Sequence, residues 1–597
     1  MDQVRYQLSI SDISAHTLQV RLEFQPPSAE PVELSLPAWI PGSYMIRNFA
    51  KHLARLRAVD AVGELPIEAL TKQQWRLTHR GTAVVVTYQL YAFDASVRAC
   101  YINDQIALIN PAACCLAISG LADAPCLVEM LTVASKPEWQ VATGLTPAEG
   151  TAPLGFGHYT AVNYQVLIDT PLMLGVLDYQ WFELAGVRHH LVFVGASHSD
   201  TARICRDLPP ICQQHIELFG GLPADLTDYW FLTWVVDQGY GGLEHHNSTV
   251  LMCSRYDLPN PLQPDVLSPD YQTFLGLCSH EYFHTWWVKR AKPAIFQPYQ
   301  LASEQYTQQL WLYEGFTSYY DDLALVRAGV IDANAYLLAL AKTISRVQRA
   351  PSNTEQSLAE SSFTAWTKFY LQDENAINSV VSYYAKGSLV ALCLDAALRA
   401  RHLSLDVLMQ RCYQHFTERT TGSADDDFFQ LLAEYCQDED QDEALVAQCR
   451  QWVQEPVALP LDSALASLGV TLSYRAATSG KDLGGPAKFA APVRDFGALY
   501  QSNAEGLLLT AVIAGTAAFD AGLMAGDLLV AIAGFKATEQ NLNEMLQRHP
   551  VGSKVRIHWF RQQRLLDAEF AIQLAAEHIA ELTLQPSDLA NAWLNRG

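Results

Sequence analysis

The chain has 597 residues, of which 50% are hydrophobic and 17% are charged. At roughly 100–200 residues per domain, this length predicts about three to five domains, and the apolar content is enough for large cores. The 40 Lys and Arg residues against 63 Asp and Glu give a net charge of −23. Because phosphate backbones and anionic lipid surfaces attract positive charge, we expect neither nucleic acid nor a membrane as a partner.

The cysteine pattern and the apolar segments predict a cytoplasmic protein. The twelve cysteines include no C-x-x-C pair, so neither a zinc ribbon nor a compact disulfide framework is indicated, and free thiols are expected. Residues 1–8 alternate polar and apolar and lack the basic and apolar parts of a signal peptide. The most apolar region, residues 506–535, is interrupted by glycines and by Asp520 and Asp527, which disfavours a membrane span.

Residues 1–170 are predicted to form a β-sandwich-like domain. Apolar and polar residues alternate over 17–24 and 83–91, as in half-buried strands. Pro and Gly clusters such as Pro41-Gly42 mark turns between strands. Few stretches keep a helical period in this region, so we expect an all-β domain.

Residues 171–460 are predicted to form a mixed domain in which strands precede long helices. Strands are expected at 189–194 and 229–236. Apolar residues recur with helical spacing in six segments, 269–290, 303–327, 333–348, 380–402, 404–417 and 426–436. The acidic residues 438–443 are expected in a solvated loop or helix end. Residues 461–597 change to Gly- and Ala-rich strands with one short helix, which completes an α+β multidomain organisation.

One motif dominates the chemistry of the chain. Residues 280–284 read H-E-Y-F-H, an H-E-x-x-H pattern inside a predicted helix. Four residues are about one helical turn, so His280 and His284 project from the same face and can both bind one zinc ion. Glu281 is placed to act as general base toward a water that the metal has made more acidic. The alternative is a surface helix with two histidines and a salt-bridging glutamate.

A second segment supplies a third ligand for this metal. Residues 311–320 carry one carboxylate, Glu314, among aromatic and apolar side chains. A buried carboxylate costs several kcal/mol unless it is paired or ligates a metal. Two histidines and one glutamate leave a fourth position open for water, which is the pattern of catalytic zinc sites. Pro293 and Pro298 interrupt the chain between the two helices, so the second can turn back on the first. Glu314 could alternatively be a partly exposed helix residue.

Two further segments fit a peptidase. A glycine-rich run follows a strand, and its Gly241 and Gly242 would let a peptide backbone approach closely while Glu244 pairs with a free α-amino group. The run could instead be a tight turn with a surface glutamate. Tyr383 and Tyr384 open another predicted helix, where a tyrosine hydroxyl could donate to an oxyanion. Such a pair is also common in core packing.

Together these motifs resemble the glycyl aminopeptidase family of zinc peptidases, which is related to aminopeptidase N within the gluzincins. The resemblance rests on H-E-Y-F-H, L-W-L-Y-E-G-F-T-S-Y-Y, G-G-L-E-H and Y-Y-A-K-G, with P-A-W-I-P-G-S-Y and L-I-D-T-P earlier in the chain. It covers nearly the whole chain. It implies a β-rich N-terminal domain over 1–170, a thermolysin-like catalytic domain with a helical half over 171–460, and a C-terminal PDZ domain with a tail over 461–597.

The resemblance also implies how the metal is held. His280, His284 and Glu314 match the ligands of one zinc ion per chain, and Glu281 matches the general base. The family further implies that small N-terminal residues, Gly or Ala, are removed from peptide substrates.

Two substrate-contacting roles follow from the same resemblance. Glu244 falls where related enzymes carry the glutamate of a G-x-M-E-N motif that holds the substrate amine, although leucine and histidine replace Met and Asn here. Tyr384 aligns with the tyrosine of the Y-x-K-G pattern that stabilises the transition state. The adjacent Tyr383 could be confused with it.

The C-terminal region resembles bacterial PDZ domains over residues 515–534, with a late strand at 555–561. In such domains a glycine-containing loop presents backbone N–H groups to a peptide carboxylate, and residues 496–499 are the candidate loop. A peptide C-terminus is therefore a candidate partner. The alternative is a packing module without a ligand.

The favoured hypothesis is a zinc-dependent aminopeptidase that acts on short peptides. A zinc endopeptidase on the same scaffold is the first alternative, and blocking the substrate amine distinguishes the two. A non-catalytic PDZ peptide-binding protein is the second, and the intact set of ligands with Glu281 argues against it. A serine hydrolase is not indicated, because the sequence has no G-x-S-x-G motif.

Overall fold

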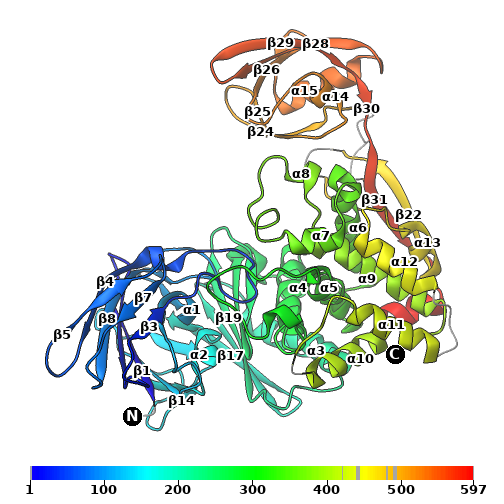
Figure 1. The fold of residues 1–597 in the computed structure, drawn as a ribbon. Coiled ribbons are helices and arrows are strands. Elements are labelled where there is room, and N and C mark those ends of the chain that lie inside the picture. Colours follow the sequence, from blue (N-terminus) through cyan, green and yellow to red (C-terminus); the bar gives the residue numbers. More distant parts are fainter. Residues whose placement is uncertain (1–2, 420, 439–443, 479–481, 488–493, 596–597) are drawn as a thin grey trace. The chain divides into compact units, whose positions relative to one another are not determined.

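The computed structural model describes residues 3–419, 421–438, 444–478, 482–487 and 494–595 (Figure 1). It divides into two compact units. The first unit comprises Met1–Gln305 and Tyr413–Ser423, and the second comprises Tyr306–Cys412 and Ala424–Gly597. The first is rich in β-sheet, and the second combines a helical region with further strands. This organisation confirms the expected α+β class with a β-rich N-terminal part.

Three sheets form the N-terminal part of the first unit. The largest has the strand order β14 (Thr146–Pro147), β15 (Gly157–Ala161), β12 (Cys126–Met130), β1 (Val4–Asp12), β2 (Thr17–Phe24), β8 (Val84–Tyr91), β4 (Leu53–Val59) and β5 (Glu64–Leu65). The second sheet has the strand order β13 (Gln140–Thr143), β16 (Leu172–Gly175), β10 (Ile106–Ile109) and β9 (Tyr101–Ile102). The third has the order β11 (Ala117–Ile118), β3 (Val32–Ser35), β7 (Gln74–Leu77) and β6 (Ile67–Ala69). Two short α-helices, α1 (Pro111–Cys114) and α2 (Tyr164–Ile168), accompany them.

Strands β2 and β8 show why this part folds as sheet. They pair antiparallel, and about every second side chain along each is buried, because apolar and polar residues alternate. Their bounds confirm the strands predicted at 17–24 and 83–91.

A five-stranded sheet with two helices completes the first unit. Its order is β17 (Asp178–Leu184), β18 (Val187–Val194), β19 (Asp228–Val236), β21 (Ser248–Ser254) and β20 (Gly241–Glu244). Strands β18, β19 and β21 are parallel, and β20 runs antiparallel at the edge. The bounds of β18 and β19 confirm the strands predicted at 189–194 and 229–236. Helices α3 (Thr201–Phe219) and α4 (Pro269–Phe283) pack against each other.

Helix α3 is not predicted by the sequence patterns. Pro209 and Pro210 lie inside it, and proline ordinarily interrupts a helix. The helix persists because Ile204, Leu208 and Ile211 are buried on one side of it, so tertiary packing outweighs the lost backbone hydrogen bonds.

The helices that carry the metal motifs are shorter than predicted. The prediction spans 269–290, but α4 ends at Phe283 and the chain then turns, with Val288 at a φ of 82°. The helix predicted over 303–327 begins with one turn of π-helix, Trp311–Gly315, and continues as α5 (Phe316–Arg327). Single π-turns occur frequently at functional sites.

Four of the helices that follow agree with the predicted periodicity within a few residues: α6 (Ala333–Arg349), α9 (Tyr383–Arg399), α10 (Leu405–Glu418) and α11 (Asp427–Asp438). The other four were not predicted: α7 (Leu358–Phe363), α8 (Ala376–Ser379), α12 (Ala444–Gln454) and α13 (Leu461–Ser467). The acidic stretch 438–443 starts at the end of α11 and otherwise lies outside the described residues. By length and composition, Ala376–Arg399 could cross a membrane, but 67% of its apolar window is buried inside the protein, as in a core helix.

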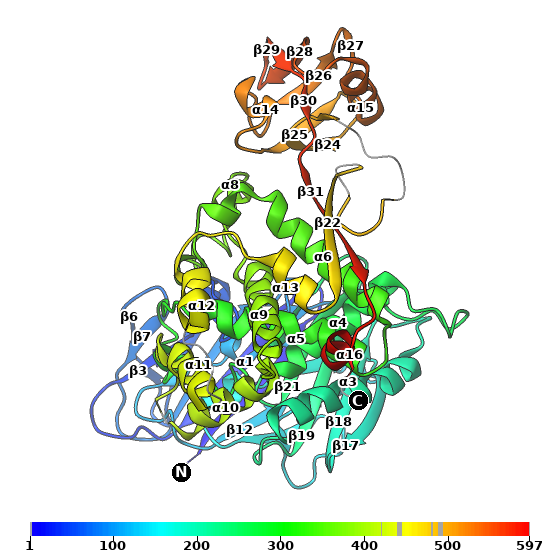
Figure 2. The ribbon, with the colours of Figure 1, turned by 90° about the vertical axis from the view of Figure 1, so that its right-hand side faces the viewer.

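The last part of the second unit contains a ribbon and a separate sheet. Strands β22 (Val470–Ala476) and β31 (Glu577–Leu584) form an antiparallel ribbon beside α6 (Figure 2). Between them lies what we call the C-terminal module, residues 494–574. Its sheet has the strand order β24 (Ala498–Ser502), β25 (Leu507–Val512), β26 (Leu528–Ile532), β28 (Lys554–Arg561) and β29 (Arg564–Ala571). Strand β27 (Phe535–Lys536) also pairs with β26. Strands β23 (Arg494–Asp495) and β30 (Gln573–Leu574) form a separate short pair.

The C-terminal module has helices α14 (Ala517–Asp520) and α15 (Glu539–Arg548) and a hydrophobic core of its own. After the ribbon, α16 (Asp588–Leu594) returns to the helical region, where the Trp593 indole N–H donates to the Tyr319 hydroxyl at 2.9 Å. The expectation of one short helix after residue 461 is therefore wrong. Short helices with small apolar residues carry too weak a periodic pattern to be recognised among Gly- and Ala-rich strands.

Candidate metal centre and active site

Helix α4 presents the H-E-x-x-H motif at its C-terminal end. It begins after Ser268, whose hydroxyl accepts a hydrogen bond from the Tyr271 N–H at 3.1 Å, and Pro269 occupies the first helical position. His284 follows the last helical residue but keeps α-helical dihedral angles. The two imidazoles therefore retain the one-turn spacing that the sequence predicts.

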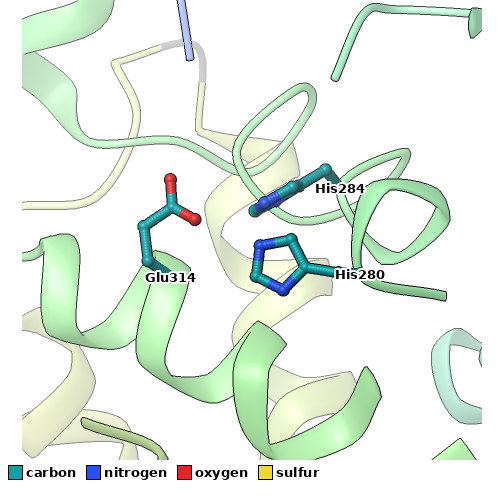
Figure 3. Close-up of side chains that lie close together, drawn as sticks. All are labelled: His280, His284 and Glu314. Atoms are coloured by element: carbon teal, nitrogen blue, oxygen red, sulfur yellow. The ribbon is translucent and has the colours of Figure 1, made fainter. Parts of the chain in front are cut away.

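The three predicted metal ligands lie together. The ligand atoms of His280, His284 and Glu314 are all within 4.8 Å of one another, and the side chains converge (Figure 3). His284 and Glu314 are buried, and His280 is half-buried. Two imidazoles and one carboxylate at this spacing fit a catalytic metal site of the zinc type.

The ring of His284 is oriented by the turn after α4. Its Nδ1 lies 2.9 Å from the carbonyl oxygen of Trp287. Because a carbonyl oxygen accepts hydrogen bonds, Nδ1 carries the proton and Nε2 is left to bind a metal. The end of α4 at Phe283 therefore positions His284, because in a continued helix the Trp287 carbonyl would accept a hydrogen bond from the backbone instead.

Glu281 is buried, with 5% of its surface exposed, and lies directly against strand β20. A Cβ atom built on Gly242 would overlap the Glu281 carboxylate. The glycine therefore lets the edge strand approach the predicted general base as closely as a backbone can. The Gly242 carbonyl accepts a hydrogen bond from Arg98 at 3.1 Å.

Glu244 lies at the end of β20 and is 4% exposed. A loop of the N-terminal part meets it: a Cβ atom on Gly42 would lie 2.6 Å from Glu244 Oε2, and Gly42 has a φ of +91°. Both the close approach and the backbone angle require glycine at this position. The P-G-S-Y motif therefore forms one wall around the predicted amine-binding carboxylate, a role that sequence reasoning did not assign to it.

A partly buried carboxylate, that of Asp169, links the residues after β20 to the turn after α4. Asp169 accepts hydrogen bonds from Lys289 Nζ at 2.8 Å and from the His246 backbone N–H at 3.1 Å, and His245 Nδ1 lies 3.1 Å from it. Burial by itself would raise the pKa of Asp169, but Lys289 and His245 outweigh burial and hold this pKa below its usual range. Asp169 belongs to the L-I-D-T-P segment. In the sequence, the only indication of this ion pair is that Lys289 follows apolar residues, where a buried charge needs an acidic partner.

The π-turn that carries Glu314 crosses α9 at two glycines. A Cβ atom on Gly315 would lie 2.6 Å from Gly387 Cα and 2.8 Å from the Tyr383 carbonyl oxygen. The backbones are thus in direct contact, which places Glu314 near the first turn of α9. The glycines of Y-E-G-F and Y-A-K-G are therefore required by packing. Lys386 of the second motif donates to the carbonyls of Asn353 and Val457 at 2.6 and 2.9 Å.

The two tyrosines at the start of α9 differ in exposure. Tyr383 is fully buried, whereas Tyr384 is partly exposed and its hydroxyl lies 3.4 Å from that of Tyr370. Burial and the nearby Glu314 carboxylate raise the pKa of Tyr384 well above its ordinary value. Its hydroxyl therefore remains protonated at neutral pH and can donate a hydrogen bond.

An H-E-x-x-H helix whose two histidines lie beside a buried carboxylate defines this protein as a metallopeptidase. A family model described as the Peptidase M61 N-terminal domain matches residues 5–176, and one described as M61 glycyl aminopeptidase matches residues 273–390. The solved structure of an aminopeptidase N family protein from Idiomarina loihiensis is 40% identical, covers 99% of this chain and 100% of that chain, and has a TM-score of 0.94. The chain belongs to the M61 glycyl aminopeptidase family, and it is a metallo-aminopeptidase, a hydrolase of peptide bonds.

More distant likenesses are found among solved structures as well. An M1 zinc metallopeptidase from Deinococcus radiodurans is 14% identical, with a TM-score of 0.48 over 77% of this chain and 95% of that chain. No curated protein sequence gives a significant match.

Proposed function

We propose that this enzyme is a zinc aminopeptidase that removes small N-terminal residues, Gly or Ala, from peptides. The observation that carries the proposal is the convergence of His280, His284 and Glu314 within 4.8 Å on an H-E-x-x-H helix. The donor set fits one zinc ion per chain, which His280, His284 and Glu314 would hold. Bound zinc polarises a substrate carbonyl and makes a water more acidic.

Glu281 acts as the general base. Its buried carboxylate takes a proton from the attacking water and passes it to the leaving amine. The close packing of Gly242 supports this role, because it holds the peptide-binding edge strand beside the carboxylate. Removal of water from such a site strengthens each polar interaction in it.

Substrate is held by β20 and Glu244. An edge strand offers unpaired backbone groups to an extended peptide, and a carboxylate at its end can pair with the substrate α-ammonium group. This fixes the first peptide bond over the metal ligands. The approach of Gly42 to Glu244 narrows the space around the amine, which supports a preference for small residues.

Tyr384 donates a hydrogen bond to the oxyanion that develops at the scissile carbonyl. Its partial exposure supports Tyr384 over the fully buried Tyr383.

The C-terminal module is proposed to be a PDZ-like domain that binds a peptide C-terminus. Strand β24 lies at the edge of its sheet, and α15 and β24 together line a cavity that also includes Phe496 of the predicted loop. A peptide that adds to β24 would place its last residue there. The assignment of residues 1–170, 171–460 and 461–597 to a β-sandwich-like domain, a thermolysin-like catalytic domain and a PDZ-like domain with a tail stays part of this proposal.

A cytoplasmic location is proposed as well. All twelve cysteines are free, and all but Cys205 are buried. Free thiols in this number fit a reducing compartment. The charge of −23 supports peptides, and neither nucleic acid nor membrane lipid, as partners.

Metal analysis of the purified chain and a panel of aminoacyl-coumarin substrates test the proposal. We expect one zinc per chain and the highest turnover for glycyl and alanyl substrates. N-acetylated peptides should be poor substrates, and efficient cleavage of them would instead support the endopeptidase alternative. A chain that binds peptides without hydrolysing any substrate would support the non-catalytic alternative.

A further inference from the structure

Two arginines and a histidine, each partly buried, gather at one end of the groove between β24 and α15. The groove contains a cavity of about 50 Å³ whose lining includes Arg349, Arg494 and His578. This volume is far below the roughly 300–1,000 Å³ of a small-molecule pocket and suits a carboxylate with a small side chain. Its walls are Phe496, Ala498 and Leu542 among others, so the interior beside the cations is apolar.

Each of these three side chains, two guanidinium groups and an imidazole, has a buried nitrogen without a partner in the described part of the chain. Among the residues that the structure describes, Arg349 Nε, Arg494 Nε and His578 Nε2 are buried and have no hydrogen-bond partner. Arg494 does donate from Nη1 to Gln547 Oε1 at 3.1 Å, which fixes its direction. Buried nitrogen atoms without a partner are costly. Because all three side chains line the same cavity, an anionic ligand is favoured there.

The three groups come from different parts of the second unit. Arg494 belongs to the C-terminal module, whereas Arg349 is the last residue of α6 and His578 lies on β31 of the ribbon. Helix α6 and the ribbon are joined directly, because the Ala580 N–H donates to Ser345 Oγ at 2.8 Å. Arg349 lies near enough to His578 to contribute, after burial, to lowering the pKa of that imidazole.

The charge around the cavity favours an anion. Asp495 is the acidic residue of its lining, and its side chain is exposed to solvent. Two guanidinium groups therefore outweigh one solvated carboxylate. A guanidinium also offers paired N–H donors that match the two oxygens of a carboxylate.

We infer that a peptide C-terminal carboxylate is bound jointly by Arg494 of the C-terminal module and by Arg349 and His578 outside it. The inference rests on the proposed peptide-binding groove and goes beyond it, because the module alone would supply an incomplete site. The ligand it predicts is a peptide that ends in a small apolar residue with a free carboxylate. Binding would then join the module to helix α6 and the ribbon.

Fluorescence anisotropy on the full chain tests this inference. The probe is fluorescein-Gly-Gly-Ser-Ala-Val with a free carboxylate, whose labelled N-terminus protects it from aminopeptidase cleavage. Its C-terminal amide is the matched ligand. We expect the acid to bind roughly tenfold to a hundredfold more tightly than the amide, as for a hydrogen-bonded charge.

Arg349→Gln separates a joint site from a site of the module alone. It should weaken binding of the acid roughly tenfold or more and leave binding of the amide unchanged. Arg494→Gln should have the same effect. Arg346→Gln, an exposed position on the same helix that does not line this cavity, should leave both affinities unchanged.

Several outcomes would overturn the inference. If Arg349→Gln bound the acid like the parent while Arg494→Gln did not, the groove of the C-terminal module would bind the carboxylate without Arg349, and the joint site would be rejected. Equal binding of acid and amide, or no binding by the parent, would reject the carboxylate site altogether. Arg349→Lys guards against misfolding, because it keeps the charge and should retain part of the affinity. Hydrolysis of glycyl-coumarin by the same preparations reports on the aminopeptidase proposal separately and should not change.

Discussion

Two edge strands of this molecule carry opposite charges at their ends. Strand β20 ends in Glu244, a buried carboxylate, whereas the groove beside β24 is bordered by the guanidinium groups of Arg349 and Arg494. Both strands offer backbone groups to an extended peptide. The difference teaches that any edge strand can pair with an extended peptide, whereas the charge beside the strand decides which peptide end fits there. A carboxylate suits the amino end, and guanidinium groups suit the carboxyl end.

The largest effect is expected where the metal is bound. His284→Ala should remove zinc and abolish hydrolysis of glycyl-coumarin, because a site with one histidine and one carboxylate holds zinc poorly. Metal analysis by mass spectrometry, with circular dichroism to show that the fold persists, checks it. His79→Ala, at a partly exposed position that is not part of the cluster, is the control and should keep the metal. Full zinc content in His284→Ala would reject the ligand assignment.

Glu281→Gln separates chemistry from metal binding. The amide keeps the shape of the side chain but cannot take a proton, so kcat should fall by about 10²–10⁴-fold with zinc retained. Steady-state kinetics and metal analysis on the same sample decide the outcome. Turnover near that of the parent would show that another group is the general base.

Glu244→Gln tests the charge that distinguishes β20 from β24. Loss of an ion pair with the substrate ammonium should lower kcat/KM for free-amine substrates by roughly 10–100-fold. Zinc content should not change. The few N-acetylated substrates that the parent cleaves slowly should be cleaved at a similar rate by the variant, since they carry no charge for Glu244 to hold. A variant as active as the parent on glycyl-coumarin would contradict the amine-binding role.

Asp169→Asn probes the partly buried ion pairs that link the residues after β20 to the turn after α4. We expect a loss of about 2–3 kcal/mol in the free energy of unfolding at pH 7. The pKa of Asp169 is lowered in the folded state, so its stabilisation is present above its unfolded pKa of about 3.9 and is lost as pH falls further. Urea unfolding at pH 7, 5 and 3 should therefore show the gap between parent and variant narrowing at pH 3. A gap that is the same at all three pH values would mean that the Asp169 charge does not stabilise the fold.

Gly42→Ala is expected to have the smallest effect and to act on substrate binding. A left-handed backbone angle costs a non-glycine residue about 1–2 kcal/mol, and the added methyl group would also push against Glu244. KM for glycyl substrates should rise several-fold. Gly81→Ala is a matched control, because Gly81 has a φ of +78° and nothing within 4 Å of the added atom. An equal change in KM for both variants would show that strain alone accounts for it.

Local patterns place the two histidines of the candidate metal centre side by side because their geometry is local. The spacing of His280 and His284 follows from one helical turn, and both lie with Glu314 in the structure. The end of α4 at Phe283 could not be predicted, since the apolar periodicity continues through two buried tryptophans, Trp286 and Trp287. Helix α3 could not be predicted because Pro209 and Pro210 lie inside it, and proline ordinarily ends a helix. Here burial of its apolar side chains maintains the helix past the prolines.

The sequence alone determined the class of chemistry, because residue types at helical and strand spacing specify which side chains share a face. It indicated the β-rich N-terminal part, six of the longer helices (α4, α5, α6, α9, α10 and α11), the metal ligands, Glu281 and Glu244. Tertiary structure decided which distant residues meet: Gly42 against Glu244, Gly315 against Gly387, Asp169 between His245 and Lys289, and Arg349 beside the groove of the C-terminal module. Such contacts join segments up to some two hundred residues apart, and only the packing of whole sheets and helices brings them together.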